Sequence, residues 1–293
     1  MYFLDMGGGK KLKDVTCSID RVSALAYISD LSYFSKSLEL NPYIETIYRS
    51  TRQGDYDTNI KCVDGSFIQI NSREKGEENV RVDFNPNTLH GRDTFVEMQK
   101  IIAFMKHPRM TGIDFAIDYH GYDLSSLSIS TPRSMKKAVY YAPSDKLESI
   151  TIGSGNGDKR INFYDKGYKE RKFLPKNHPH WWRIEMQRSR FKNEEDYFTN
   201  PFEGMTFTLP ASFPPDMKAA DKAMLIGLQQ QPELWSELGR KVKERLRDLH
   251  IQASTSLDPH PADVFELYKE DLQRQIHEVF IPALQNSLFY KAL

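Results

Sequence analysis

Three segments in the middle of the chain alternate apolar and polar residues with a period of two. They are GIDFAIDY (112–119), RINFYDK (160–166) and WRIEMQ (182–187). Successive side chains of an extended strand point to opposite faces, so each segment predicts a strand with one apolar and one polar face. Strands of this kind are typical of antiparallel sheets that cover a core on one side and meet water on the other.

A different spacing precedes these strands. Val22, Leu25, Ile28 and Leu31 recur at helical intervals, and Asp20 stands where an N-cap would stand. This pattern predicts a helix over residues 21–38.

The remaining elements follow from the same two periods and from turn residues. We expect strands over 65–71 and 79–87, a helix over 93–107, strands within 110–124, a hairpin over 148–166, a strand over 180–190, and helices over 217–231, 232–250 and 261–280.

The order of these elements predicts an α+β protein of two strand-rich units with mostly antiparallel sheets, followed by a helical region. The expected units are an N-terminal α+β unit (1–107), a second strand-rich unit that carries the polar faces (108–210), and a helical C-terminal region (211–293).

Composition narrows the class of protein. With 293 residues, of which 39% are hydrophobic and 27% charged, the chain has enough apolar residues for a globular core, which argues against a disordered or fibrous protein. No apolar run approaches the roughly 20 residues of a membrane span, and the glycine-broken first residues do not resemble a secretory signal. The two cysteines, Cys17 and Cys62, lack metal-site spacing. We therefore expect a cytoplasmic protein without a membrane partner.

The net charge is zero, but it is unevenly distributed along the sequence. Residues 156–192 contain eleven basic and four acidic residues, a net charge of +7, so the rest of the chain carries −7. A segregated basic region is typical of a phosphate-binding surface, although a solvated charged face has the same composition.

The polar faces carry a set of carboxylates. Asp114 and Asp118 share one face of the first strand, and Glu185 occupies the polar face of the third. Carboxylate oxygens suit a hard ion such as Mg²⁺ or Mn²⁺, which would neutralise a phosphate oxygen. Solvent-facing residues of an edge strand would give the same pattern of aspartates.

The second strand adds a tyrosine among cations. Tyr164 is a candidate nucleophile, and Arg160 and Lys166 on the same face would stabilise charge on a phosphate or lower the pKa of the phenol. Tyrosine is also common in strands for packing reasons. Together the three faces point to transesterification of a phosphodiester.

The motifs, taken in order, resemble rolling-circle replication initiators of small Gram-positive plasmids, the Rep_trans family, which also includes relaxases of conjugative elements. The similar blocks are GIDFAIDY, TIGSGNGDKRINFYDKGYKE (151–170) and WRIEMQRSR (182–190), together with VRVDFNPNTL (80–89). The resemblance covers roughly residues 65–192.

This resemblance implies a metal-dependent, site-specific DNA nickase. Tyr164 would attack one strand at the double-strand origin, become joined to the 5′ phosphate and release a 3′ hydroxyl primer. Asp114, Asp118 and Glu185 match metal-associated acidic positions, and Arg183 and Lys166 match basic catalytic positions. The residues expected to contact DNA are Lys159, Arg160, Asn162, Arg188 and Arg190.

Two other motifs compete for these roles. Tyr168 shares strand parity with Tyr164, but Gly167 is expected to end the strand before it. The His178-Pro-His180 segment is similar to the His-hydrophobe-His metal motif of other nickases, whereas its proline favours a loop before the next strand.

The helical region is the candidate for origin recognition or dimerisation. Its segment 232–250 has an apolar stripe and a basic face, which suits either phosphate contacts or a solvated amphipathic helix. The resemblance implies plasmid origin DNA, single-stranded DNA and a host helicase as partners, and a homodimer. A conjugative relaxase and a non-catalytic origin or operator binder remain the alternatives.

Overall fold

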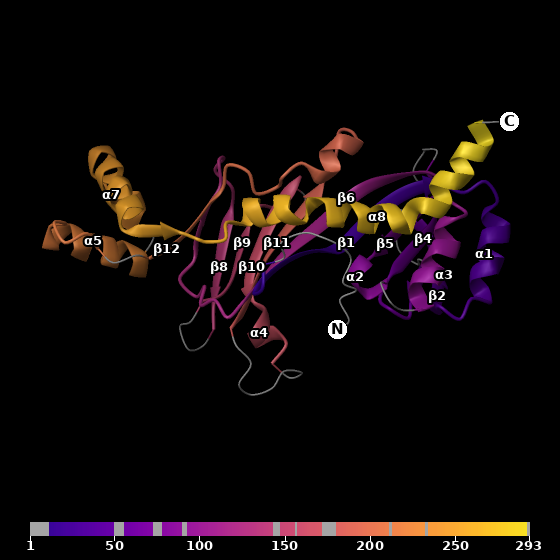
Figure 1. Cartoon of the computed structure of the whole chain (residues 1–293), viewed down its shortest axis with the longest axis horizontal. Helices are drawn as coiled ribbons and strands as arrows, with labels where there is room; N and C mark the ends of the chain where they lie inside the picture. Colours follow the sequence, from indigo (N-terminus) through magenta and orange to yellow (C-terminus); the bar gives the residue numbers. More distant parts are fainter. Residues whose placement is uncertain are drawn as a thin grey trace.

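The protein is built around one long antiparallel sheet. Its strands lie in the order β2-β3-β4-β5-β1-β6-β11-β10-β9-β8, and β13, β12 and β7 form a second, smaller sheet (Figure 1). The computed structural model describes residues 12–49, 56–72, 78–89, 93–142, 147–155, 157–171, 180–210, 213–231 and 234–291. The strands are β1 (Val15–Tyr27), β2 (Ile44–Arg49), β3 (Tyr56–Cys62), β4 (Phe67–Ser72), β5 (Val80–Phe84), β6 (Lys106–His120), β7 (Ser128–Ser130), β8 (Lys137–Tyr141), β9 (Leu147–Ile152), β10 (Lys159–Asp165), β11 (Trp181–Ser189), β12 (Thr206–Pro210) and β13 (Ser254–Ser256).

This architecture confirms the predicted α+β class with antiparallel sheets. The strands of the two predicted units, however, form one continuous sheet, because β1 pairs with β6 along almost its whole length. The predicted boundary after residue 107 falls inside β6, which begins at Lys106. The division of the chain into these units stays a prediction.

The prediction of a helix over residues 21–38 is wrong for the first half of that range. Residues up to Tyr27 belong to β1, and helix α1 covers only Leu31–Glu39, with Asp30 rather than Asp20 as its N-cap. The same residues also fit a period of two: β1 lies between β5 and β6, and its buried alternate positions belong to the core. Pairing with two neighbouring strands therefore outweighs the local helical spacing.

The sequence contains only a weak strand signal for β2 and β8, which form the two edges of the sheet. All five residues of β8 are exposed, and β2 has no buried position. An edge strand without a buried face lacks the alternation from which a strand is predicted. The predicted strands and hairpin in the middle of the chain are confirmed as β4, β5, β6, β9, β10 and β11.

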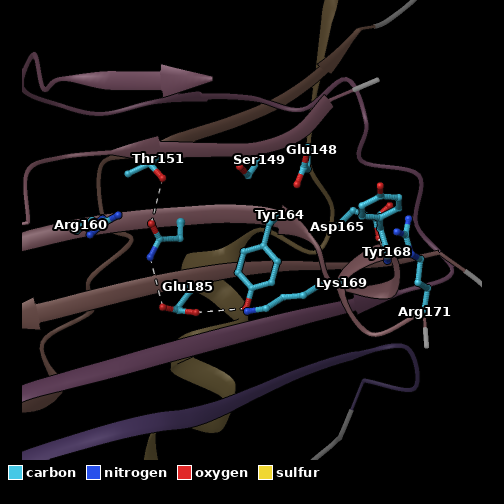
Figure 2. A pocket seen from close by; sticks show the side chains of 11 residues that line it. Glu148, Ser149, Thr151, Arg160, Tyr164, Asp165, Tyr168, Lys169, Arg171 and Glu185 are labelled. Atoms are coloured by element: carbon cyan, nitrogen blue, oxygen red, sulfur yellow. Dashed lines mark hydrogen bonds between the residues drawn. The ribbon is translucent and has the colours of Figure 1, made fainter. Parts of the chain in front are cut away.

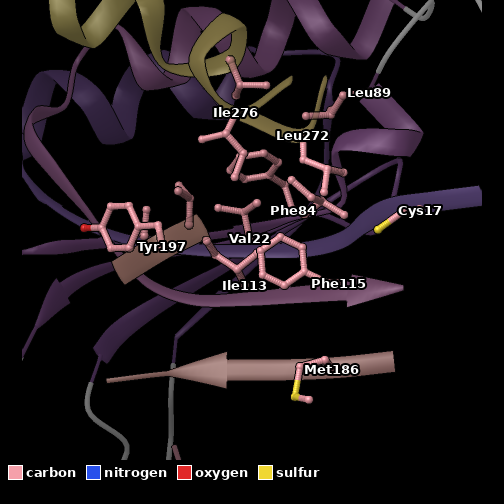
Figure 3. Close-up of a cluster of buried hydrophobic side chains, with 14 of the residues drawn as sticks. Cys17, Val22, Phe84, Leu89, Ile113, Phe115, Met186, Tyr197, Leu272 and Ile276 are labelled. Atoms are coloured by element: carbon pink, nitrogen blue, oxygen red, sulfur yellow. The ribbon is translucent and has the colours of Figure 1, made fainter. Parts of the chain in front are cut away.

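Helices cover the apolar face of the sheet. The long helix α8 runs along β1 and β6, and Figure 3 shows its Leu272 and Ile276 lying over Phe84 and Phe115 in the core. The helices are α1, α2 (Pro86–Leu89), α3 (Asp93–Ile102), α4 (Lys166–Lys169), the 3-10 helix η1 (Glu194–Phe198), α5 (Ala219–Gln230), α6 (Leu234–Glu237), α7 (Arg240–Gln252) and α8 (Pro261–Lys291).

The predicted C-terminal region divides between two cores. Helix α8 belongs to the main core, whereas α5, α6 and α7 lie beyond the sheet and share a small core of their own around Leu225 and Leu246 (Figure 1). The apolar stripe predicted for 232–250 lines this second core. Within the described residues, no helix has both the length and the apolar character that crossing a membrane requires.

Candidate active site

The sheet order brings the three predicted polar faces together. Strand β11 lies between β6 and β10, so that Tyr164 stands opposite Arg183, which in turn stands opposite Asp118. One step along, Asn162 stands opposite Glu185. Directly opposed residues share a face of the sheet, so these side chains line the face that α8 leaves uncovered.

Strand β1 adds a residue that the sequence did not predict. The register between β1 and β6 shifts between Ile19 and Arg21, which marks a β-bulge at Asp20. A bulge turns one side chain toward the face of its neighbours, and the Asp20 carboxylate accepts a hydrogen bond from the Arg183 guanidinium. No signal in the sequence identified this role, because Asp20 was expected to cap a helix.

Arg183 is held between two carboxylates. Its Nε donates to Asp118 Oδ1 at 2.8 Å and its Nη2 to Asp118 Oδ2 at 2.5 Å, while Trp181 Nε1 also donates to Asp118 Oδ1 at 2.7 Å. The Arg183 and Asp118 side chains are only 7% and 9% exposed. Burial opposes ionisation of Asp118, but the hydrogen bonds and charge of Arg183 outweigh it and lower the pKa of Asp118. This pair is therefore a buried, charged clamp between β6 and β11.

Asp118 consequently does not stand with Asp114 and Glu185 as a third open carboxylate, since Arg183 donates to both of its oxygens and Trp181 donates to Oδ1. Asp114 and Glu185 flank the amide of Gln187, whose Nε2 lies 3.5 Å from Asp114 Oδ2 and 3.0 Å from Glu185 Oε1. Burial raises the pKa of Asp114 to about 7. Among the described residues, no group of three or more His, Cys, Asp or Glu side chains is placed to hold a metal ion.

Tyr164 lies in a pocket on the polar face. The pocket has a volume of about 520 Å³, and Figure 2 shows the Tyr164 ring within it, between the residues of β9 and Glu185 of β11. Tyr164 Oη donates a long hydrogen bond of 3.4 Å to Glu185 Oε2. Burial raises the pKa of Tyr164, so the phenol is protonated at neutral pH and needs a proton acceptor before it can attack.

Helix α4 forms one wall of this pocket. The helix starts at Lys166, directly after the N-cap Asp165. Lys166 is therefore the first residue of a helix and not, as predicted, a residue of the strand. Its ammonium lies 4.6 Å from the centre of the Trp181 ring. Lys169, which the sequence analysis did not single out, instead lies over Tyr164, with its Nζ 5.0 Å from the centre of the ring. The sequence analysis expected an extended chain at Lys166. Because residues 166–169 form a helical turn instead, Lys169 and not Lys166 lies over Tyr164.

The rival tyrosine also lines the pocket. Tyr168 belongs to α4, not to β10, and is 42% exposed, with the Arg171 guanidinium 4.1 Å from the centre of its ring. Of the rival histidine motif, His178 lies outside the described residues. The main-chain oxygen of His180 accepts a hydrogen bond from Gly121 at 2.7 Å, just before β11 begins.

The predicted DNA-contacting residues divide between the two faces of the sheet. Arg160 and Asn162 line the pocket with Tyr164. Lys159 and Arg188 stand opposite each other, and each lies an odd number of residues from the pocket-lining positions of its own strand. Both side chains therefore point to the other face of the sheet.

Two of the predicted cations already have partners in the fold. Arg188 Nη1 donates to the main-chain oxygens of Asp196 at 2.8 Å and Thr199 at 2.9 Å. Arg190, just after β11, is ion-paired with Asp158 at 3.3 Å. These contacts place both side chains outside the pocket.

A replication initiation protein of Staphylococcus aureus is 29% identical over 201 residues, which is 68% of this chain and 63% of the relative. A second such protein from the same organism is 29% identical over 209 residues, which is 71% of the chain and 64% of the relative. The chain is similar to replication initiation proteins. This finding confirms the resemblance that the ordered motifs predict.

The chain spans a little under two thirds of the length of these relatives. No family model matches it. Among solved structures, a rolling circle replication initiator protein from Geobacillus stearothermophilus aligns with a TM-score of 0.39 and 10% identity, covering 60% of this chain and 74% of that protein.

Proposed function

We propose that the chain initiates rolling-circle replication by nicking one DNA strand with Tyr164. The observation that carries this proposal is the placement of the Tyr164 hydroxyl in an open pocket of the polar face, hydrogen-bonded to Glu185 and bordered by Lys169. The similarity to replication initiation proteins supports the substrate class, which is the origin DNA of a plasmid.

The proposed reaction is a transesterification. Glu185 Oε2 accepts the phenolic proton, Tyr164 Oη attacks the phosphorus, and the bond between the phosphorus and the 3′ oxygen breaks. The released 3′ oxygen takes a proton from water and becomes the primer terminus. The strand remains joined to Tyr164 through its 5′ phosphate, so the energy of the phosphodiester is retained in the phosphotyrosyl bond.

Cations near the reacting atoms stabilise the charge that develops on the phosphate. Lys169 lies over the Tyr164 ring, and Arg160 lines the same pocket. Arg183, opposite Tyr164 in the ladder, lies between Asp20 and Asp118, and its charge lowers the pKa of Tyr164 against the larger effect of burial. We assign Arg183 a positioning role in the nicking reaction, since its hydrogen bonds are made to these two carboxylates.

Mg²⁺ or Mn²⁺ is part of the same proposal. Asp114 and Glu185, on either side of the Gln187 amide, fit the usual magnesium mode, in which one or two carboxylates bind together with water and phosphate oxygens. When bound, such an ion neutralises a phosphate oxygen and polarises the phosphorus. Asp118 is not a proposed ligand, because Arg183 occupies both of its oxygens.

The partners follow from the proposed reaction. The resemblance to rolling-circle initiators implies cleavage in a locally opened duplex, so we expect a supercoiled or cruciform origin and a host helicase. Termination requires a second nucleophile, which a homodimer would supply. The helices α5 to α7, outside the main core, are the proposed contact to origin DNA or to the second subunit.

The test uses supercoiled DNA of the replicon that encodes the chain, with Mg²⁺. The wild-type protein should nick it and remain attached to the 5′ end, and mass spectrometry of the nucleotide-linked peptide should identify Tyr164. Tyr164→Phe should abolish the adduct, whereas Tyr168→Phe, which alters a second tyrosine of the same pocket, should retain it. An adduct that survives Tyr164→Phe refutes the assignment. Binding without any nicking would favour a non-catalytic origin binder. Nicking that persists in EDTA would refute the proposed role of Mg²⁺ or Mn²⁺.

A further inference from the structure

A second pocket lies on the same face of the sheet, beyond the end of the first. It has a volume of about 250 Å³ and is lined by residues of β1, β5, β6, β10 and β11, including Arg21, Arg81 and Arg160. Arg21 and Arg81 come from the first half of the chain and have no part in the proposed reaction at Tyr164. This second pocket therefore needs its own explanation.

Arg21 and Arg81 share one carboxylate. Arg21 donates from Nε and Nη2 to Asp83 Oδ1 at 3.0 and 2.8 Å, and Arg81 Nε lies 2.9 Å from Asp83 Oδ2. The carboxylate of Asp114 also lines the pocket, and with Arg160 the three guanidinium groups outnumber the two carboxylates of Asp83 and Asp114, which leaves a net positive charge. The Asp83 carboxylate is the least accessible of the three ion-paired groups, with Asp83 14% exposed, Arg81 34% and Arg21 49%. Both arginines are thus ion-paired with Asp83, and both line the pocket.

Arg160 lies between the two pockets and lines both of them. Its Nε is buried, and in the part of the chain that the structure describes it has no hydrogen-bond partner. Its Nη1 points toward the Gly155 loop, where an added Cβ would lie 4.0 Å away. A buried donor without a partner is unfavourable, and an anion bound beside it would satisfy it.

The two pockets are close enough to hold one strand. Arg160 and Tyr164 lie four residues apart on β10, which corresponds to about 13 Å along a strand. Figure 2 shows Arg160 at the end of the first pocket that lies away from Arg171 and Tyr168. A short oligonucleotide with one phosphate at Tyr164 therefore reaches the second pocket with a phosphate only a few nucleotides away.

We infer that Arg21, Arg81 and Arg160 form a binding site for a phosphodiester of the single strand that lies a few nucleotides from the phosphate presented to Tyr164. The planar, many-donor guanidinium group suits phosphate oxygens, and arginines held on strands by a shared carboxylate are already ordered before the anion arrives. This inference rests on the proposed function for the identity of the ligand. It adds the first half of the chain to the DNA-binding surface.

Binding of a fluorescein-labelled oligothymidylate in EDTA, followed by anisotropy at several salt concentrations, tests this site without cleavage. The protein carries Tyr164→Phe throughout, so that no covalent product contributes. Arg21→Gln should weaken binding roughly tenfold. It should also reduce the slope of log K against log salt by about 0.7, the value for one phosphate contact to a single strand.

Two further variants control for charge and folding. Arg21→Lys keeps the charge and should recover most of the salt slope. Arg274→Gln removes an arginine that is also paired with a carboxylate, Asp271, but on α8, which covers the opposite face, and should bind like the parent. Urea unfolding of each variant confirms that the fold is retained.

The outcomes separate the site from the nicking reaction. Unchanged affinity and slope in both Arg21→Gln and Arg81→Gln would overturn the phosphodiester site, even if Tyr164 forms the adduct. An equal loss in Arg274→Gln would also overturn it, because the effect would then be one of total charge. A failure of Tyr164 to form the adduct would refute the proposed function and leave this binding measurement intact.

Discussion

Replacement of Arg183 by methionine tests the buried clamp between β6 and β11. Methionine has a similar length but no charge, so Asp118 loses two hydrogen bonds and its counter-ion, and Asp20 loses a partner. Removing one member of a buried ion pair costs about 3–5 kcal/mol, because the remaining charge stays buried without compensation. We therefore expect Arg183→Met to lower the free energy of unfolding by about 3–5 kcal/mol at pH 7, a large part of the stability of an ordinary domain.

The pH dependence of this loss has a definite sign. In the wild-type protein the pKa of Asp118 lies below its usual value, so its stabilising contribution is present at neutral pH and is lost only as the pH falls through that lowered pKa. Without Arg183, burial raises the pKa of Asp118, and the carboxyl is protonated in the folded variant at mildly acidic pH. The difference in stability between the two proteins should therefore shrink as the pH is lowered from 7 toward 4.

Urea unfolding at a series of pH values, followed by tryptophan fluorescence, measures both effects. In the double variant Arg183→Met/Asp118→Asn the buried negative charge is absent, and about 2 kcal/mol of the loss should be recovered. Arg274→Met breaks an exposed pair with Asp271 and should change the unfolding free energy by less than about 0.5 kcal/mol. A loss below about 1 kcal/mol for Arg183→Met, or a loss that does not vary with pH, would refute the clamp.

Four further variants test the core, a turn, a helix interior and the site. Phe265→Ala removes a buried ring that packs edge-on against β6, and should lower the unfolding free energy by about 3–5 kcal/mol in urea. Gly153→Ala should destabilise the protein by about 1–3 kcal/mol, because its φ is +105° and the new Cβ would lie 2.6 Å from a main-chain oxygen; Gly227→Ala, in the open interior of α5, should instead raise stability by about 0.4–1 kcal/mol. Glu185→Gln removes a charge that raises the pKa of Tyr164, so NMR titration of the labelled tyrosine, assigned with Tyr164→Phe, should show a lower pKa; an unchanged or higher value would contradict the contact.

The sequence predicted the polar faces correctly where a strand alternates cleanly and is paired on both sides. Strands β6, β10 and β11 have this pattern, and the opposition of Tyr164 to Arg183 and of Asn162 to Glu185 follows once the three are neighbours. The ordered motifs also predicted the similarity to replication initiation proteins, which the sequence comparison confirms. Local pattern was sufficient here because each of these strands has one face on the core.

Two errors arose where distant residues decided the outcome. Residues 21–27 satisfy both a helical and a two-residue period, and only the pairing of β1 with β5 and β6 selects the strand. The same pairing creates the bulge that turns Asp20 toward Arg183. The third error, by contrast, is local: Lys169 and not Lys166 lies over Tyr164 because Asp165 caps a helical turn that begins at Lys166.

The sequence alone determined which side chains share a face of each central strand, because alternation is a property of the extended backbone. Which carboxylate remains open was decided by tertiary structure. Asp114 and Asp118 are equivalent positions of one alternating strand, yet Arg183 engages both oxygens of Asp118, whereas Asp114 faces the Gln187 amide. The strand neighbours and the bulge in β1 set this difference, and both depend on residues distant in the sequence.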